Sequence, residues 1–169
     1  MTGGPLNSVY YWVGKPAHER NSYLQQSFIL SLILSLLILI VGIPFISTIA
    51  NFMQIPWQYV IVLLLSAFFT VPAAFYNEAN IALGKTLKGS LYSVAFESIK
   101  VISFITIAYL VKDLGNIFLS YSVILGTKFL VTIVLGMREN LIKFKVEKDK
   151  IKEIFNYCFP ISLAGLVTF

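Results

Sequence analysis

Three ionisable side chains lie inside long apolar stretches of this sequence. Glu97 and Lys100 are near the middle of the stretch 88–111, and Lys128 lies well inside the stretch 114–137. A charged side chain at the centre of a bilayer costs roughly 2.5–3.5 kcal/mol unless it meets a partner or water. Such residues are therefore typical of a transport pathway or a binding cavity.

Glu97 and Lys100 are three positions apart, so a helix places them on nearly the same face, where they can pair. Two interpretations follow. In one, the pair belongs to a polar stripe that lines a cavity; in the other, it neutralises itself and only packs the bundle. Lys128 must reach the membrane surface, pair or face water. We expect it to pair with Glu97 across a helix contact, which leaves Lys100 to face the cavity.

A second polar group, Asn77, Glu78 and Asn80, follows the apolar stretch 57–76. Asn77 and Asn80 are candidate ligand contacts at the mouth of a cavity. The alternative, which the sequence favours, is a hydrated helix end.

Chemistry that would indicate an enzyme is not evident in the sequence. Cys158 is the single cysteine, which excludes an intramolecular disulfide and a multi-cysteine metal site. His18 is the one histidine and has no companion for metal binding. Paired carboxylates and a nucleophile–base pair are also not evident. We therefore expect no enzyme, no metal and no cofactor.

The composition predicts an all-α polytopic membrane protein. Hydrophobic residues make up 57% of the 169 residues and charged residues 12%, and no Asp, Glu, Lys or Arg lies between Arg20 and Glu78. Soluble domains carry about 25% charged residues. The net charge of +5 comes mostly from loops, where positive residues set orientation, so we expect the lipid bilayer as a partner and no nucleic acid.

Each of four segments is long enough to be a complete transmembrane helix, which needs about 20 apolar residues. They are 26–49, 57–76, 88–111 and 114–137. Residues 1–25 are expected to form an aromatic lead and a loop, and 138–153 a charged connector, as an amphipathic or solvated surface helix. Residues 154–169 look like the start of a further membrane helix, at which the chain appears truncated.

Smaller features predict how the four helices pack, bend and connect. A stripe of Ser27, Ser31, Ser35 and Gly42 predicts a helix-packing face, since small residues let helices approach closely. Prolines at positions 44 and 72 predict bends. Lys112–Gly115 is expected to form a tight turn.

The positive charges predict the orientation. They gather in alternate loops at 15–20, 77–88 and 138–153, whereas the opposite side has only Lys112, balanced by Asp113. By the positive-inside rule these three loops are cytoplasmic, in a multi-pass protein of the cell inner (plasma) membrane.

The order of these features resembles a known family. An aromatic, glycine-containing lead (GGPLNSVYYWVG) is followed by a short loop with Glu19 and Arg20, paired spans, and a charged connector leading into the segment IFNYCFPIS at 154–162. This is similar to the polysaccharide flippases of the multidrug/oligosaccharidyl-lipid/polysaccharide exporter superfamily, of which the chain would be a fragment.

The resemblance implies a larger transporter of two similar halves that flips lipid-linked oligosaccharide outward by alternating access. The remaining helices of that transporter and the lipid-linked glycan would be its partners. Lys100 and Lys128 would bind the anionic pyrophosphate or acidic sugars, and Glu97 would titrate if transport is coupled to a proton or sodium gradient.

Two other functions stay open. A multidrug or cation exporter of the same superfamily would favour an acidic cavity, whereas the spans here hold two lysines and one glutamate. A small four-helix accessory protein of glycan assembly would require a complete last helix, which the apolar ending at Phe169 argues against.

Overall fold

The structure, a computed structural model, describes residues 5–111 and 114–167, and these residues form helices joined by short links, without a strand. In chain order the elements are α1 (Pro5–Trp12), α2 (Ala17–Gly42), the 3₁₀ turn η1 (Ile43–Phe45), α3 (Ile46–Met53), α4 (Trp57–Ala82), α5 (Thr86–Leu110), α6 (Leu114–Arg138) and α7 (Lys148–Val167).

Four segments of the described chain are long and apolar enough to cross a membrane: Glu19–Met53, Trp57–Ala82, Thr86–Leu110 and Gly115–Arg138. Together with the helical architecture, they confirm the predicted all-α polytopic membrane fold.

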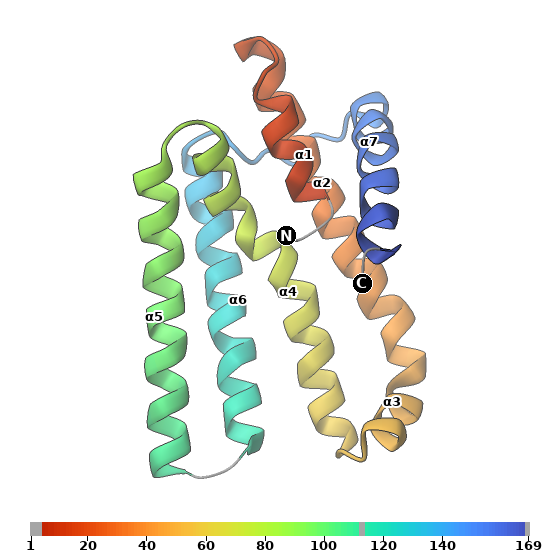
Figure 1. Ribbon diagram of the computed structural model, residues 1–169, viewed down its shortest axis with the longest axis vertical. Helices are drawn as coiled ribbons and strands as arrows, with labels where there is room; N and C mark the ends of the chain where they lie inside the picture. The colour runs from red at the N-terminus through yellow and green to blue at the C-terminus, as the bar shows by residue number, and fades with distance from the viewer. Residues whose placement is uncertain (1–4, 112–113, 168–169) are drawn as a thin grey trace.

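The bundle is organised around α4, which packs against α2, α5 and α6 (Figure 1). The α1–α2 link, the α4–α5 link and the connector after α6 all lie at one end, the top of Figure 1, and α3 lies at the other. We call the first end the loop end. It carries Lys15, Lys85 and Arg138, one residue from each of the three predicted basic loops. That it faces the cytoplasm remains a prediction.

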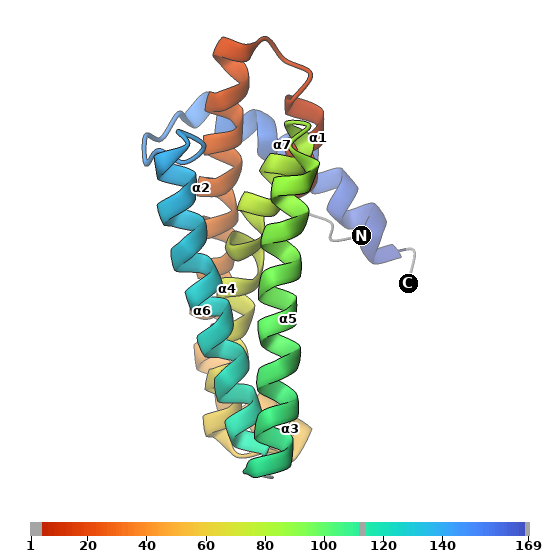
Figure 2. The same cartoon turned by 90° about the vertical axis from the view of Figure 1, so that its left-hand side faces the viewer.

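The last helix, α7, lies at the side of the bundle and projects away from it (Figure 2). It packs against α1 and α2. Its helix begins at Lys148, earlier than the predicted start at residue 154, because its charged first turns are held against α2. Residues 168–169 of the predicted segment 154–169 lie outside the described part of the chain.

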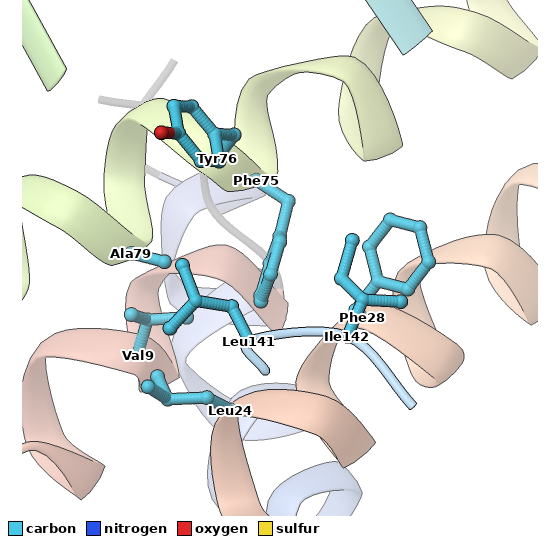
Figure 3. Close-up of a cluster of buried hydrophobic side chains, with 8 residues drawn as sticks. All are labelled: Val9, Leu24, Phe28, Phe75, Tyr76, Ala79, Leu141 and Ile142. Carbon is cyan, nitrogen blue, oxygen red and sulfur yellow. The ribbon is translucent and has the colours of Figure 1, made fainter. Parts of the chain in front are cut away.

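A buried apolar cluster joins four segments near the loop end (Figure 3). α1 contributes one residue, α2 and α4 several, and the connector two: Val9, Leu24, Phe28, Phe75, Tyr76, Ala79, Leu141 and Ile142. Burial of these side chains is the main force that holds the connector against the bundle.

The predicted first span, 26–49, has different ends. The helix begins after Pro16, whose φ of −52° suits a helix start, so residues 17–20 of the expected loop 15–20 are helical. Apolarity indicates which residues can lie in the bilayer, but a helix can extend beyond its apolar part, as the polar residues that open α2 do. Pro44 lacks a backbone N–H and falls in η1, so α2 ends at Gly42, as the predicted bend implies.

The second span is also longer than predicted. Residues 77–82 continue α4, and the expected loop 77–88 shrinks to 83–85, where Gly84 takes a left-handed φ of +76°. Pro72 lies inside α4, which is continuous through it. Polar residues do not end a helix when they can pack, which is what Asn80 does at 0% exposure.

The connector is not the expected surface helix over 138–153. α6 ends at Arg138, Asn140 takes a left-handed φ of 58°, and the backbone is non-helical up to α7. The Lys145 oxygen and the Glu147 N–H bond to a side chain of α2, and the N–H groups of Leu141 and Ile142 bond to the Gly136 backbone oxygen at the end of α6. The predicted turn Lys112–Gly115 includes residues 112–113, outside the described residues.

The small-residue stripe of α2 is a packing face, as predicted. Ser27, Ser31 and Ser35 are at most 1% exposed. A Cβ atom added to Gly42 would lie 2.5 Å from Cδ2 of Leu64 in α4, so a larger residue here would require the Leu64 side chain to shift.

Candidate functional site: an intramembrane charge cluster

The three predicted ionisable residues of the membrane interior lie together on α5 and α6. Lys100 forms an ion pair with Glu97 on α5. Lys128 of α6 places Nζ 3.8 Å from Oε1 of Glu97. The expected contact between Glu97 and Lys128 is therefore present, and we call Glu97, Lys100 and Lys128 the charge cluster.

Aromatic rings surround the two ammonium groups. Lys128 Nζ lies 6.0 Å from the ring centre of Tyr92 and 5.9 Å from that of Phe96. Lys100 Nζ lies 6.0 Å from the ring centre of Tyr121. Cations are attracted to such ring faces, more so where water is scarce. The rings therefore offset part of the hydration that the two ammonium groups lose in a bilayer.

Tyr92 also fixes α5 against α6. Its hydroxyl donates to the backbone oxygen of Lys128 at 2.8 Å and lies 2.8 Å from Oγ1 of Thr132. Thr132, which is fully buried, donates to the backbone oxygen of Ala73 at 2.9 Å. This chain of bonds ties α5, α6 and α4 together beside Lys128.

The cluster is closed on one side and open on the other. The Lys128 side chain is 11% exposed, that of Lys100 27% and that of Glu97 51%. Glu97 borders an open hollow of about 480 Å³ on the outer face of α5, lined by Ser93, Val94, Glu97, Ser98, Val101 and Ile102. None of the residues in the most apolar window of α5 is buried. A ligand or a further helix can therefore approach Glu97 directly.

The chemistry available to this arrangement is the binding of an anion. Two ammonium groups face one carboxylate, so the cluster has an excess positive charge. In a low-dielectric setting an opposite charge gains far more from such an excess than it does in water. Neighbouring hydroxyls of Ser93 and Ser98 offer hydrogen bonds beside Glu97.

Asn77 and Asn80 do not belong to the cluster. They lie where α4 meets the start of α5: a Cβ on Gly89 would lie 2.9 Å from the Asn77 backbone oxygen. Glu97 is eight residues beyond Gly89, about 12 Å along the helix. Asn80 is 0% exposed and donates to the Tyr76 backbone oxygen at 2.8 Å, so the expected hydrated helix end is wrong for it, and it serves packing.

Sequence reasoning missed an ion-paired group at the loop end. Lys88 Nζ lies 2.6 Å from Oε1 of Glu139, and the Tyr76 hydroxyl donates to the same oxygen at 2.5 Å. Burial opposes ionisation of Glu139, but the bonds from Lys88 and Tyr76 outweigh it and lower the pKa of this carboxyl. Lys88 and Glu139 are separated by 51 positions, and no local pattern signals such a pair.

Another missed contact joins α1 to α4. The Tyr10 hydroxyl donates to Oε2 of Glu78 at 2.5 Å. Partial burial and this bond raise the pKa of Tyr10 to about 12. Glu78, predicted at a ligand site or a hydrated end, therefore anchors the short first helix.

The connector is held by side chains from the start of α2. Gln26, at 0% exposure, donates to the Lys145 backbone oxygen at 2.7 Å and accepts from the Glu147 backbone N–H at 3.0 Å. Gln25 donates to the Asn140 backbone oxygen at 3.1 Å. We call Gln25, Gln26 and their connector partners the connector clamp.

Charged groups reinforce the clamp where the connector enters α7. Ser22 donates to Oε2 of Glu147 at 2.9 Å, and Lys150 Nζ lies 2.7 Å from the same oxygen. The bonds from Lys150 and Ser22 lower the pKa of the Glu147 carboxyl. In the sequence, nothing about glutamines in a polar run indicates that they would bind the backbone of the connector.

No family model, no curated protein and no solved structure matches this chain. What the chain does must therefore be argued from the charge cluster and its setting.

Proposed function

We propose that this protein is a segment of a membrane transporter that flips lipid-linked oligosaccharide across the bilayer by alternating access. The observation that supports this function is the charge cluster: two lysines and one glutamate near the middle of two apolar helices, with one side open. If these three residues only stabilised the fold, we would expect all three side chains to be buried.

The proposed substrate is anionic because the cluster is cationic. The pyrophosphate that links a glycan to its lipid, or acidic sugars, would take the place of Glu97 beside Lys100 and Lys128. Ammonium groups bind phosphate oxygens by charge-assisted hydrogen bonds, which are about twice as strong as neutral ones. The rings of Tyr92 and Phe96 limit the contact of Lys128 with lipid.

Glu97 gives the cluster a way to respond to an ion gradient. Binding of a proton or a sodium ion at its carboxylate would remove the negative charge that holds Lys100 and Lys128. Both ammonium groups would then be free to bind substrate. In this proposal Glu97 and the substrate compete for the same two lysines, and binding of the ion to Glu97 favours the substrate.

The test is glycan delivery by cells that carry Lys100→Gln and Lys128→Gln in the protein's own gene. We expect surface glycan to fall at least about tenfold, equivalent to about 1.4 kcal/mol, while lipid-linked precursor accumulates inside. The control is Lys143→Gln, which removes an exposed lysine of the connector.

Normal glycan delivery by the double variant, present in the membrane at the normal amount, would overturn the proposal. Loss of drug or cation resistance with normal glycan delivery would favour the exporter alternative. An unchanged precursor pool with reduced glycan would favour an accessory role in glycan assembly.

A further inference from the structure

A second basic site lies at the loop end and is separated from the charge cluster by the Tyr92 ring, which lines the site and also lies 6.0 Å from Lys128 Nζ. It is an open groove of about 570 Å³ between the ends of α4, α5 and α6, lined by Tyr76, Lys88, Tyr92, Leu135, Arg138 and Glu139. We call it the basic groove. We infer that the basic groove binds the phosphate headgroup of an anionic phospholipid, independently of any transported substrate.

The groove has more cationic charge than its own carboxylate neutralises. Glu139 is paired with Lys88 and hydrogen-bonded to Tyr76. Arg138, at the rim, has no ion pair within the described part of the chain, and neither does Lys85. Both side chains are exposed. The groove therefore has an excess of one cation, Arg138, and Lys85 beside it adds a second.

Lys88 stands between two hollows. On its other side, Lys85 and Lys88 line an open depression of about 430 Å³ together with Thr86, Leu87 and Leu91. The Lys88 ammonium lies 5.8 Å from the ring centre of Tyr76, which holds it between the two. A phosphate seated at Lys88 would thus have Lys85 on one side and Arg138 on the other.

The walls below this basic rim are apolar. Leu135 lies three residues deeper than Arg138 along α6, and Leu91 three residues deeper than Lys88 along α5, a step of about 4.5 Å. Leu87 and Leu91 are 73% and 61% exposed. Basic residues at the helix ends, with apolar side chains towards the membrane centre, match the headgroup and the acyl chains of a phospholipid.

This gradient from basic to apolar is the argument for a lipid instead of a soluble phosphate. A soluble anion would contact the rim only, whereas a phospholipid would contact both the rim and the leucines below it. Tyr76 and Tyr92, with ring centres 4.9 Å apart, form the aromatic wall of the groove between the basic rim and the interior.

The experiment is native mass spectrometry of the purified protein in detergent with added phosphatidylglycerol or phosphatidylcholine. We expect adducts with the anionic lipid and few with the zwitterionic one. Each basic residue near a membrane surface contributes about fivefold in affinity for anionic lipid, so Lys85→Gln/Arg138→Gln should weaken binding about 25-fold and each single variant about fivefold. Neither residue has an ion pair to break.

The matched control is Lys143→Gln/Lys152→Gln, which removes the same charge from exposed positions away from the groove. Equal weakening in the control would show a general charge effect and overturn the site. Displacement of the lipid by millimolar glycerol phosphate would show a site for soluble phosphate and would overturn it as well. Unchanged lipid adducts with Lys85→Gln/Arg138→Gln would likewise overturn the site.

Discussion

The connector clamp and the charge cluster use polar side chains in opposite ways. In the clamp, Gln26 is fully buried and both ends of its amide are bonded to the connector backbone at 2.7 and 3.0 Å. In the cluster, Glu97 is 51% exposed and its contact with Lys128 is 3.8 Å long. Polar groups that hold a fold are expected to be buried and satisfied. The cluster does not meet this description, which marks it as a candidate for binding.

The largest expected effect is that of Gln26→Leu in the clamp. The change leaves the Lys145 carbonyl and the Glu147 N–H without their partners, and each unsatisfied buried group costs about 1–3 kcal/mol. We expect a loss of about 2–5 kcal/mol in the free energy of unfolding. The measurement is the melting temperature in detergent, together with trypsin cleavage after Lys143 and Lys145.

The control for that variant is Gln58→Leu, at an exposed position of α4. A Gln26→Leu protein with the wild-type melting temperature and the wild-type cleavage rate would show that the connector clamp does not stabilise the fold.

A smaller effect, with a pH dependence, is expected of Glu139→Gln at the loop end. The folded protein lowers the pKa of Glu139, so its contribution is present above the unfolded pKa of about 4.3 and is lost as pH falls through the folded pKa. At pH 7 the variant should be less stable by about 1.5–3 kcal/mol, the range for hydrogen bonds to charged groups.

The check is the difference in melting temperature between wild type and Glu139→Gln from pH 7 downward. That difference should shrink steadily below about pH 5 as the carboxyl protonates. A difference that is constant over this range would show that the ionised form of Glu139 contributes nothing.

Next in size is the effect expected of Tyr92→Phe, beside the charge cluster. It removes the hydroxyl bonded to the Lys128 carbonyl and Thr132, at an expected cost of about 1 kcal/mol. Tyr109→Phe, on the exposed end of α5, is the matched control and should cost nothing measurable. Equal melting temperatures for the two variants would mean that Tyr92 does not tie α5 to α6.

The smallest effect on stability is expected of Glu97→Gln in the cluster. Glu97 is half exposed, and pairs of exposed charges contribute about 0–1 kcal/mol. We expect normal membrane yield and a melting temperature close to that of the wild type. A collapse of yield that Lys128→Gln restores in the double variant would make the pair structural and would break the comparison.

The sequence predicted what the bilayer itself dictates. Long apolar runs must be helices in a membrane because no other local structure satisfies their backbone, so the four spans were predictable. The contact of Glu97 with Lys128 was predictable for a similar reason, since charges at that depth have few alternatives. The small-residue stripe likewise predicted a packing face of α2, which meets α1 at Ser27 and α4 at Gly42.

The rest depends on contacts between distant parts of the chain. Gln26 and its connector partners are 119 and 121 positions apart, and Tyr76 and Glu139 are 63 apart. No periodicity or composition signals which polar residues will meet at such separations. The helix ends were missed for the same reason, because packing partners, and not apolarity, keep residues 77–82 helical.

The central claim is that the charge cluster faces a hydrated pathway, and its most direct measurement is the reactivity of a cysteine placed there. Cys158, the one natural cysteine, is replaced by serine, and Glu97→Cys is compared with Ile40→Cys, an exposed apolar position of α2 with no charged neighbour in its stretch. Both are treated, in membranes, with a charged, water-soluble maleimide. The account predicts rapid labelling at position 97 and none at position 40. Equal protection of both positions would place Glu97 against lipid or protein and would contradict the account.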